Sequence, residues 1–515
     1  MSVAEAEQRA GLPLRTIRRA RTAVVEEVEG ASPAQRRARH VVAVAVVAAG
    51  VLLRLRAQSP MWLDEAQTVS IGRLPLQQMF AALRQDGSPP LYYVLLHGWI
   101  RVFGQGTNAL RLLSGVFSLA SLPVGWQVAR RLGGREVAWT TVVLLASSPF
   151  AIRYATETRM YELVILLVLL GTLAVLRALE SPTRGRLAAV AAAAGALVLT
   201  HYWGAFLIAG AVLVLLAARR PLVAPRPARL VAAALVAGSA SFVVWIPSFV
   251  FQVTRTGAPW GTPAGFSVPH VALQGFVGGT TQTGSLLELL LVGVVGFAVL
   301  AAPPSSWPRP LTAVAAITLT LGTVFTWLTG SAFHPRHAAV AFPAVVIAAA
   351  VGVTWLAHPW RRLALITAMA VLGLVAALPA VTEPRTQAGQ IAAEIQAVAR
   401  PGDIVAVCPD QLAPALARLL PGVPMRVLPE GSDPERVNWV DYDKRVADLD
   451  PAAEAVALNQ AAGTGSVLLV WSPTYLRIGS RCNLLRLALQ DLRPDGEELV
   501  RIRRSLVEDA WLWRG

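Results

Sequence analysis

Acidic residues are scarce over most of this 515-residue chain, which carries 31 Asp and Glu residues against 46 Lys and Arg residues. Charged residues make up 15% of the sequence, whereas a soluble domain normally has about 25%. Eighteen of the acids lie from Glu383 onward and five lie before residue 30. An acid kept in an apolar region is costly, so those that remain are candidates for chemistry. Between residues 41 and 381 there are eight: Asp64, Glu65, Asp86, Glu136, Glu157, Glu162, Glu180 and Glu288.

Cysteine and lysine are rarer still. Cys408 and Cys482 are the only cysteines, which excludes a disulfide-rich scaffold, and their spacing matches no zinc motif. A disulfide in an oxidising compartment and two buried thiols both stay open. Lys444 is the only lysine, so the net charge of +15 comes from arginine. Most of these arginines lie in short loops between apolar runs, which is typical of an oriented membrane protein rather than a nucleic-acid-binding protein.

Long apolar runs dominate what is present, and 55% of the residues are hydrophobic. A helix crosses a bilayer with about 20 residues, with some variation for tilt. The first run is followed by further runs, so it predicts a retained helix rather than a signal peptide. The predicted spans are 39–57, 108–129, 136–152, 160–179, 187–200, 203–218, 228–251, 286–302, 311–330, 338–357 and 363–380.

The arginines of the loops predict the orientation. With residues 1–38 in the cytoplasm, the tail, Arg39 directly after it and the loops on its side hold 21 arginines, against ten on the opposite side through residue 381. This asymmetry predicts a cytoplasmic N-terminus and an extracytoplasmic C-terminus. It also gathers residues 58–107, 153–159 and 331–337 on the outer side. Within the first of these loops, Pro89-Pro90 precedes a short apolar run, 91–103, that we expect to lie at the membrane interface.

Composition changes near Glu383, where charges return and apolar runs shorten. Residues 403–408 and 466–471 have the pattern of buried strands, and residues 386–399 and 481–492 that of helices. We therefore expect three parts: a cytoplasmic tail over 1–38, a transmembrane domain over 39–381 with a catalytic first outer loop at 58–107, and an extracytoplasmic α/β domain over 382–515.

Three clusters on the predicted outer side carry candidate chemistry: Asp64-Glu65, the segment from Arg153 to Tyr161, and Phe333 to His337. Paired carboxylates suit a general base or a metal site. Neighbouring residues of a helix point about 100° apart, so we expect only one of the two carboxylates to face a site. Each cluster also has a structural alternative, namely a helix cap, an interfacial ion pair or an anchoring arginine. The presence of all three clusters on one predicted face favours a functional site over these structural alternatives.

In order along residues 40–380, these motifs resemble the GT-C membrane glycosyltransferases, in particular the family of the protein O-mannosyltransferases and the bacterial lipid A aminoarabinose transferases. Each motif is weak alone, and the set is specific. The segments that carry the resemblance are Trp62-Leu63-Asp64-Glu65-Ala66, Ser88-Pro89-Pro90-Leu91-Tyr92-Tyr93, Ala109-Leu110-Arg111-Leu112, Ser148-Pro149-Phe150, Thr156-Glu157-Thr158-Arg159-Met160-Tyr161 and His201-Tyr202.

The resemblance implies a polytopic α-helical membrane protein that transfers a mannose-like hexose or an arabinose-like pentose from a polyprenyl-phosphate donor to an acceptor hydroxyl, with inversion. It implies Asp64 as base, Glu65 and Glu157 as further catalytic acids, and Arg336, His337, Arg153 and Arg159 as ligands of the donor phosphate. Substrate contacts are expected from Tyr161, Tyr92, Tyr93 and His201. No nucleotide-binding loop is visible, in agreement with a lipid-phosphate donor.

Several alternatives stay open at this point. Relatives often have His or Glu-Lys before the Pro-Pro pair, whereas this chain has Gly87-Ser88, with Asp86 one position earlier. A divalent metal such as Mg or Mn at Asp86 and a metal-free site are both compatible with this departure. A transporter or flippase of lipid-linked sugars is the alternative function, although no repeat symmetry is visible. We expect the acceptor to be a glycan, a glycolipid or a protein, and we expect the protein to lie in a bacterial plasma membrane. We expect no nucleic acid as a partner.

Overall fold

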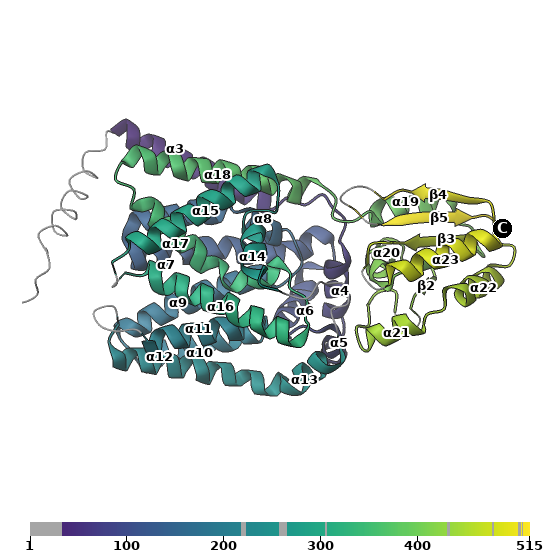
Figure 1. Ribbon diagram of the computed structural model, residues 1–515, viewed down its shortest axis with the longest axis horizontal. Helices are drawn as coiled ribbons and strands as arrows, with labels where there is room; N and C mark the ends of the chain where they lie inside the picture. The colour runs from purple at the N-terminus through teal and green to yellow at the C-terminus, as the bar shows by residue number, and fades with distance from the viewer. Residues whose placement is uncertain are drawn as a thin grey trace, which may run out of the picture.

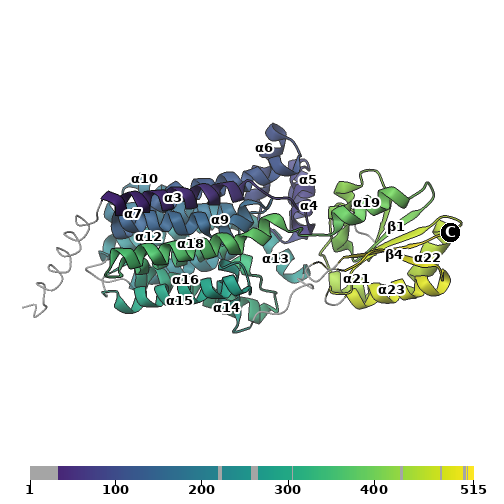
Figure 2. The same ribbon diagram turned by 90° about the horizontal axis from the view of Figure 1, so that it is seen from above.

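The computed structural model describes residues 33–217, 223–256, 265–303, 306–429, 433–475, 478–502, 506 and 508–515. Most of the tail predicted over 1–38 therefore lies outside the described residues. Within them, a bundle of long helices is followed by a five-stranded sheet with flanking helices, which stands at one end of the bundle (Figures 1 and 2). The protein is a multi-helix membrane protein with a small C-terminal α/β region.

The bundle contains all eleven predicted apolar runs, since each overlaps a helix. By length and composition, six helices of the described chain are able to cross a membrane, and α11 and α17 are shorter apolar helices. The long elements of the bundle are α3 (Pro33–Arg54), α7 (Thr107–Ser147), α9 (Tyr161–Glu180), α10 (Arg184–Val198), α11 (Trp203–Ala217), α12 (Pro225–Ser239), η1 (Ala240–Trp245), α13 (Ile246–Arg255), α15 (Gln282–Ala301), α16 (Pro308–Thr329), α17 (Phe342–Thr354) and α18 (Pro359–Thr382).

Three predicted spans differ from the helices at their ends. The runs 108–129 and 136–152 form one element, α7, which bends where Gly134 adopts a φ of 83° that side chains disfavour. The second run stops at Ser147, because Ser148 caps a new helix, α8 (Pro149–Ala155), by accepting the N–H of Ala151. The run 338–357 begins as a 3₁₀ helix, η2 (Pro335–Val340), before α17.

Short helices cover the end of the bundle that faces the sheet. They are α4 (Leu63–Gly72), α5 (Leu76–Asp86) and α6 (Leu91–Phe103), with α14 (Val268–Phe276) beside the bundle. Figure 1 shows α4 and α5 between the long helices and the C-terminal region. The run 91–103 has the predicted bounds, because Pro90 precedes the helix and Gly104 follows it with a φ of 76°. The first predicted outer loop is therefore largely helical.

The C-terminal sheet has the strand order β2-β1-β3-β5-β4, in which β1 pairs in parallel with β2 and β3, and β5 is antiparallel to both neighbours. Its elements are α19 (Ala388–Val398), β1 (Ile404–Cys408), η3 (Asp410–Leu412), α20 (Ala413–Leu419), β2 (Met425–Val427), α21 (Tyr442–Asp448), α22 (Pro451–Ala462), β3 (Val467–Trp471), α23 (Gly479–Leu492), β4 (Gly496–Val500) and β5 (Asp509–Trp513).

Side chains of the central strands alternate between two cores. Val405 and Val407 of β1 pack against α19 and α20, whereas Ala406 and Cys408 pack toward α22 and α23. Figure 2 shows α19 on one side of the sheet and α23 on the other. Cys408 forms a disulfide with Cys482 of α23, with a Cα–Cα distance of 5.5 Å. Of the two alternatives left open by the sequence, the structure contains the bridge.

Candidate functional site

The first turn of α4 carries the paired carboxylates, and they point in different directions. The Glu65 side chain is fully buried, with Arg111 donating to its two oxygens at 2.7 and 2.6 Å and the N–H of Thr158 donating at 3.0 Å. The Asp64 side chain is 16% exposed and forms an ion pair with Arg336 at 2.7 Å. Adjacent positions of a helix diverge in this way, so Asp64 is the carboxylate that faces open space.

The turn between α8 and α9 brings a third acid to the same place. Glu157 is buried and lies 3.2 Å from Arg153 and 3.8 Å from Arg385, measured between charged atoms. Two residues later, Arg159 points back toward α4, where it donates to the hydroxyl of Thr68 at 2.7 Å. The short connection between the two helices is therefore an ionic turn that acts on both carboxylates of α4: the charges of Arg153 and Arg159 act on Asp64, and the Thr158 N–H binds Glu65.

The 3₁₀ helix η2 delivers Arg336 from a third part of the chain. His334 caps this helix by accepting the Arg336 N–H at 3.4 Å, and His337 in turn accepts the His334 N–H at 3.3 Å. The Arg336 guanidinium lies over the ring of Trp62, 5.6 Å from its centroid. The three clusters predicted to share one face thus converge on a single site.

Electrostatics keep the two carboxylates of α4 ionised. Burial alone would raise the pKa of Asp64, but the charges of Arg336 and Arg159 outweigh burial and hold this pKa below its usual 3.8. Burial also acts on Glu65, where the hydrogen bonds and charge of Arg111 hold the pKa below its usual 4.5. At neutral pH, Asp64 is therefore a carboxylate able to accept a proton.

Two cavities meet at Arg336, which lines both. The first, here called the arginine cavity, has a volume of about 530 Å³. Its lining includes Phe150, Arg153, Tyr154, Glu157, Arg336 and Arg385. The second, here called the aspartate cavity, has a volume of about 230 Å³. Its lining includes Asp64, Gln67, Asp86, Arg159, Arg336 and Trp439.

The predicted tyrosines of α6 lie behind the aspartate cavity rather than in its lining. Both Tyr92 and Tyr93 are fully buried. Tyr93 donates to Asp86 at 3.1 Å and lies 3.4 Å from Arg159, whereas Tyr92 lies 3.4 Å from the hydroxyl of Ser114. Tyr93 therefore supports two lining residues, and Tyr92 packs α6 against α7.

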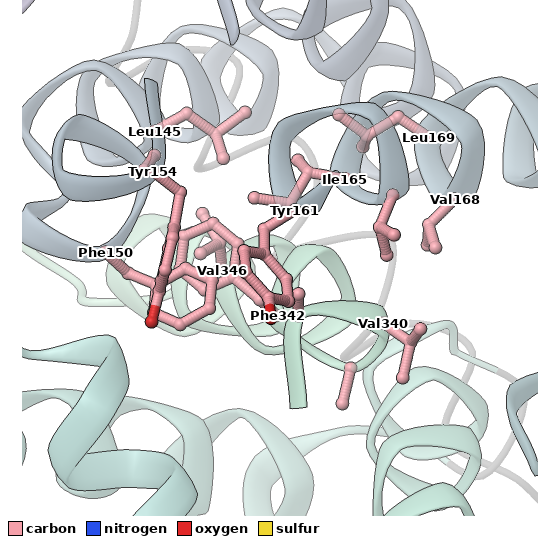
Figure 3. Close-up of a cluster of buried hydrophobic side chains, with 14 of the residues drawn as sticks. Leu145, Phe150, Tyr154, Tyr161, Ile165, Val168, Leu169, Val340, Phe342 and Val346 are labelled. Carbon is pink, nitrogen blue, oxygen red and sulfur yellow. The ribbon is translucent and has the colours of Figure 1, made fainter. Parts of the chain in front are cut away.

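Three further predicted residues belong to the core beneath the site. Figure 3 shows Tyr161 beside Tyr154 and Phe342 in a buried apolar cluster, and the Tyr154 and Tyr161 rings are 4.8 Å apart. His201 accepts the Trp203 N–H at 3.2 Å, and its ring is 5.8 Å from that of His337. Neither histidine is in the lining of the two cavities. These residues hold the elements that carry the site.

Sequence reasoning missed two arginines. Arg111, quoted only as part of the resemblance, is the bidentate partner of Glu65. Arg385, in the connection between α18 and α19, is 3% exposed and donates to the backbone oxygen and hydroxyl of Thr156 at 2.8 and 2.6 Å. Arg111 is identifiable as a cation in an apolar run, whereas Arg385 has no such signal because it follows Pro384 in a polar connection.

Asp86, the predicted metal ligand, is surrounded by hydrogen-bond donors. Ser88 donates to it at 3.0 Å, Tyr93 donates at 3.1 Å, and the Gln67 amide donates as well. Within the described parts of the chain, no group of three His, Cys, Asp or Glu residues is arranged to hold a metal ion. The donors satisfy a carboxylate without a metal, and the metal stays a prediction that rests on Asp86.

Comparison with known proteins identifies the fold first. A crystal structure of ArnT from Cupriavidus metallidurans in the apo state matches 92% of this chain and 98% of its own, with a TM-score of 0.59 at 17% identity. Residues 87–245 match the family model for dolichyl-phosphate-mannose-protein mannosyltransferase. The predicted resemblance is confirmed for the fold and, over residues 87–245, for the sequence. No curated protein has a sequence that matches the chain significantly.

Two other solved structures share the fold with bound molecules. ArnT from Cupriavidus metallidurans bound to undecaprenyl phosphate matches 94% of this chain and 100% of its own, with a TM-score of 0.54 at 17% identity. The oligosaccharyltransferase of Archaeoglobus fulgidus, tethered to an acceptor peptide, matches 86% of this chain and 72% of its own, with a TM-score of 0.53 at 10% identity. At these identities the likeness concerns the fold alone.

Proposed function

We propose that the protein transfers a sugar from a polyprenyl-phosphate donor to an acceptor hydroxyl, with Asp64 as the base and with inversion at the anomeric carbon. One observation carries this proposal: the Asp64–Arg336 pair, 2.7 Å apart, lies between the arginine cavity and the aspartate cavity. A base is then beside the residue that binds the leaving group. Both requirements of glycosyl transfer are met by one pair of side chains.

The arginine cavity suits the donor. Arg153, Arg336 and Arg385 line it and offer planar donor groups to a phosphate, and Glu157 holds two of them in place. Apolar side chains, including Phe150 and Ala376, form part of its wall and suit the first isoprene units. The undecaprenyl phosphate bound to ArnT, which has the same fold, supports this assignment.

In the proposed step, the acceptor hydroxyl enters the aspartate cavity and donates its hydrogen bond to Asp64. Its oxygen attacks the anomeric carbon from the face opposite the phosphate, and the bond from that carbon to the phosphate oxygen breaks. The proton passes to Asp64 and the electron pair leaves with the phosphate. Arg336 stabilises the charge that develops on this leaving group. Glu65, bound by Arg111, fixes the first turn of α4.

We further propose that the eleven predicted runs each cross a bacterial plasma membrane and that the site opens to the extracytoplasmic side. The excess of arginine in the loops on the side of the N-terminal tail supports this orientation. The disulfide between Cys408 and Cys482 supports it independently, since disulfides persist in oxidising compartments. The C-terminal region, over 382–515, then covers the site from outside.

The test is a transfer assay with purified protein in nanodiscs, given radiolabelled polyprenyl-phosphate mannose or its arabinose analogue and a membrane extract as acceptor source. Asp64→Asn should lose turnover by about 10²- to 10⁴-fold, the range expected for a missing general base. Its affinity for the donor should stay within a few fold of wild type, because the arginine cavity is intact.

A variant of a surface acid on the opposite end of the bundle, Glu180→Gln, is the matched control and should keep full turnover. Glu180 is exposed and forms an ion pair with exposed Arg131. Turnover by Asp64→Asn at the wild-type rate would overturn the assignment of the base. Movement of the labelled lipid across liposome membranes by both forms, without transfer, would instead identify a flippase.

A further inference from the structure

A third cavity lies beside the site, toward the C-terminal region. It has a volume of about 340 Å³ and lies between α5 and the segment 433–438. Asp86 lines both this cavity and the aspartate cavity, so the two are adjacent at that residue. We call it the carboxamide groove after its amide side chains: Gln78, Gln85 and Asn438.

We propose that the carboxamide groove binds the non-reacting part of a neutral saccharide acceptor. This inference rests on the proposed function and adds the chemical class of the acceptor. A hydroxyl delivered to Asp64 would belong to the terminal sugar, in the aspartate cavity. The preceding sugars would pass Asp86 and lie against α5.

The groove offers hydrogen-bonding groups that are not already used. Among the described residues, the side-chain amides of Gln78 and Gln85 have no hydrogen-bond partner, and both side chains are exposed. A carboxamide donates and accepts at once, which matches the hydroxyl groups of a sugar. At the entrance from the site, Trp439 lines the aspartate cavity and packs on Tyr442, with ring centroids 5.5 Å apart. Its ring suits the C–H face of a sugar.

Backbone contacts that a peptide would need are already taken. The N–H groups of Val437, Val440 and Asp441 donate to Gln67, Asn438 and the Arg255 carbonyl at 3.0, 3.0 and 2.9 Å. Thr256 pairs with Val440 as an isolated bridge. Because this segment offers no free edge for strand addition, the groove presents side chains, and a saccharide is favoured over a peptide.

Charge argues against an anionic acceptor. Asp86 and Asp433 both line the groove, and Arg436, the cation in its lining, is bound to Asp433 at 2.7 Å. A phosphorylated or carboxylated acceptor would meet this net negative charge without a free cation in the groove lining. The favoured acceptor is therefore a neutral glycan or the neutral head group of a glycolipid.

The test uses the full chain in nanodiscs and two readouts. Release of sugar from the donor to water, without acceptor, reports the proposed function, and the KM for the acceptor reports the groove. The acceptor probes are short neutral mannan and arabinan fragments and a Ser/Thr-rich peptide. Gln78→Ala and Gln85→Ala should each raise the KM for a saccharide by about 3- to 10-fold, with unchanged release to water.

Gln77→Ala is the matched control, because Gln77 is an exposed glutamine of the same helix that does not line the groove. Its KM should equal that of wild type. Glycosylation of the peptide in preference to both saccharides, or saccharide transfer insensitive to Gln78 and Gln85, would overturn the inference while sugar release persists. Absence of transfer from either donor to any acceptor in the membrane extract by wild type would instead overturn the proposed function.

Discussion

The two cavities that share Arg336 differ in what they gather. The arginine cavity combines three arginines with apolar side chains from α8 and α18, whereas the aspartate cavity combines two aspartates with two arginines, Gln67 and Trp439. Under the proposed function, a lipid-linked anion and a polyhydroxylated acceptor meet from opposite sides of one side chain. The difference teaches that donor binding and acceptor binding should be separable by mutation, except at Arg336.

The largest expected effect concerns the C-terminal region, whose Trp439 lines the aspartate cavity. Trp439 packs in the same core as Cys408 and Cys482, whose bond closes a loop of 74 residues in sequence separation. Replacing both cysteines by serine should destabilise the C-terminal region by about 4 kcal/mol through loop entropy. Thermal unfolding followed by limited proteolysis of this region measures the loss.

The same double variant should raise the KM for the acceptor by a larger factor than it weakens donor binding, because the C-terminal region contributes Trp439 to the aspartate cavity and only Leu506 beyond residue 385 to the arginine cavity. Reductant should reproduce the effect in wild type and have none on the double variant, which is the control. An equal loss of donor affinity would contradict the expectation that donor binding and acceptor binding are separable by mutation.

The next effect concerns the shared residue. Arg336→Gln removes a charge from the donor phosphate and leaves Asp64 without its partner, so we expect a loss of about 3 kcal/mol in donor binding, roughly 10²-fold in Kd. Titration with undecaprenyl phosphate measures it. Arg101→Gln, an exposed arginine of α6, is the matched control and should bind normally. Donor affinity retained by Arg336→Gln would show that Arg336 does not bind the donor phosphate.

The smallest expected effect is on the pH profile of turnover. The arginines hold the pKa of Asp64 below 3.8, so its ionised form and its ion pair both persist above that pH and are lost only as pH falls further. The donor is a phosphodiester and stays anionic. Turnover should therefore be flat between about pH 8 and pH 5. An acid limb with an apparent pKa near neutrality would identify a different base.

Local pattern and spacing predicted much of the fold. The run 91–103 was fixed by proline before it and glycine after it, and the strands over 404–408 and 467–471 by short, continuous apolar runs. The antiparallel pair β4 and β5 was not predicted, because Gly496–Val500 contains adjacent glutamates and is half-exposed at the sheet edge. Edge strands lack the apolar signal of central ones.

The site was predictable where charge stands out in an apolar setting, as for Asp64, Glu157 and Arg336. Distinguishing the roles of Asp64 and Glu65 required the partner of each, which comes from residues 46 positions away or more. Arg385 and the segment 433–439 were not predictable. They come from polar stretches in which contact with α4, α5 and α8 exists only in the folded chain.

The contacts of Arg385 matter for the design of chimeras that exchange the C-terminal region between proteins of this fold. It follows the last long helix, yet its side chain is clamped on Thr156 and its N–H donates to Ser59 at 2.7 Å. The next two residues are bound to Glu508, in the C-terminal sheet region. In a chimera joined before residue 385, the residue that contacts Thr156 in the ionic turn would come from the other protein. A chimera should therefore be joined after Arg385. The helical part then keeps its own Arg385, and the exchanged C-terminal region begins at residue 386.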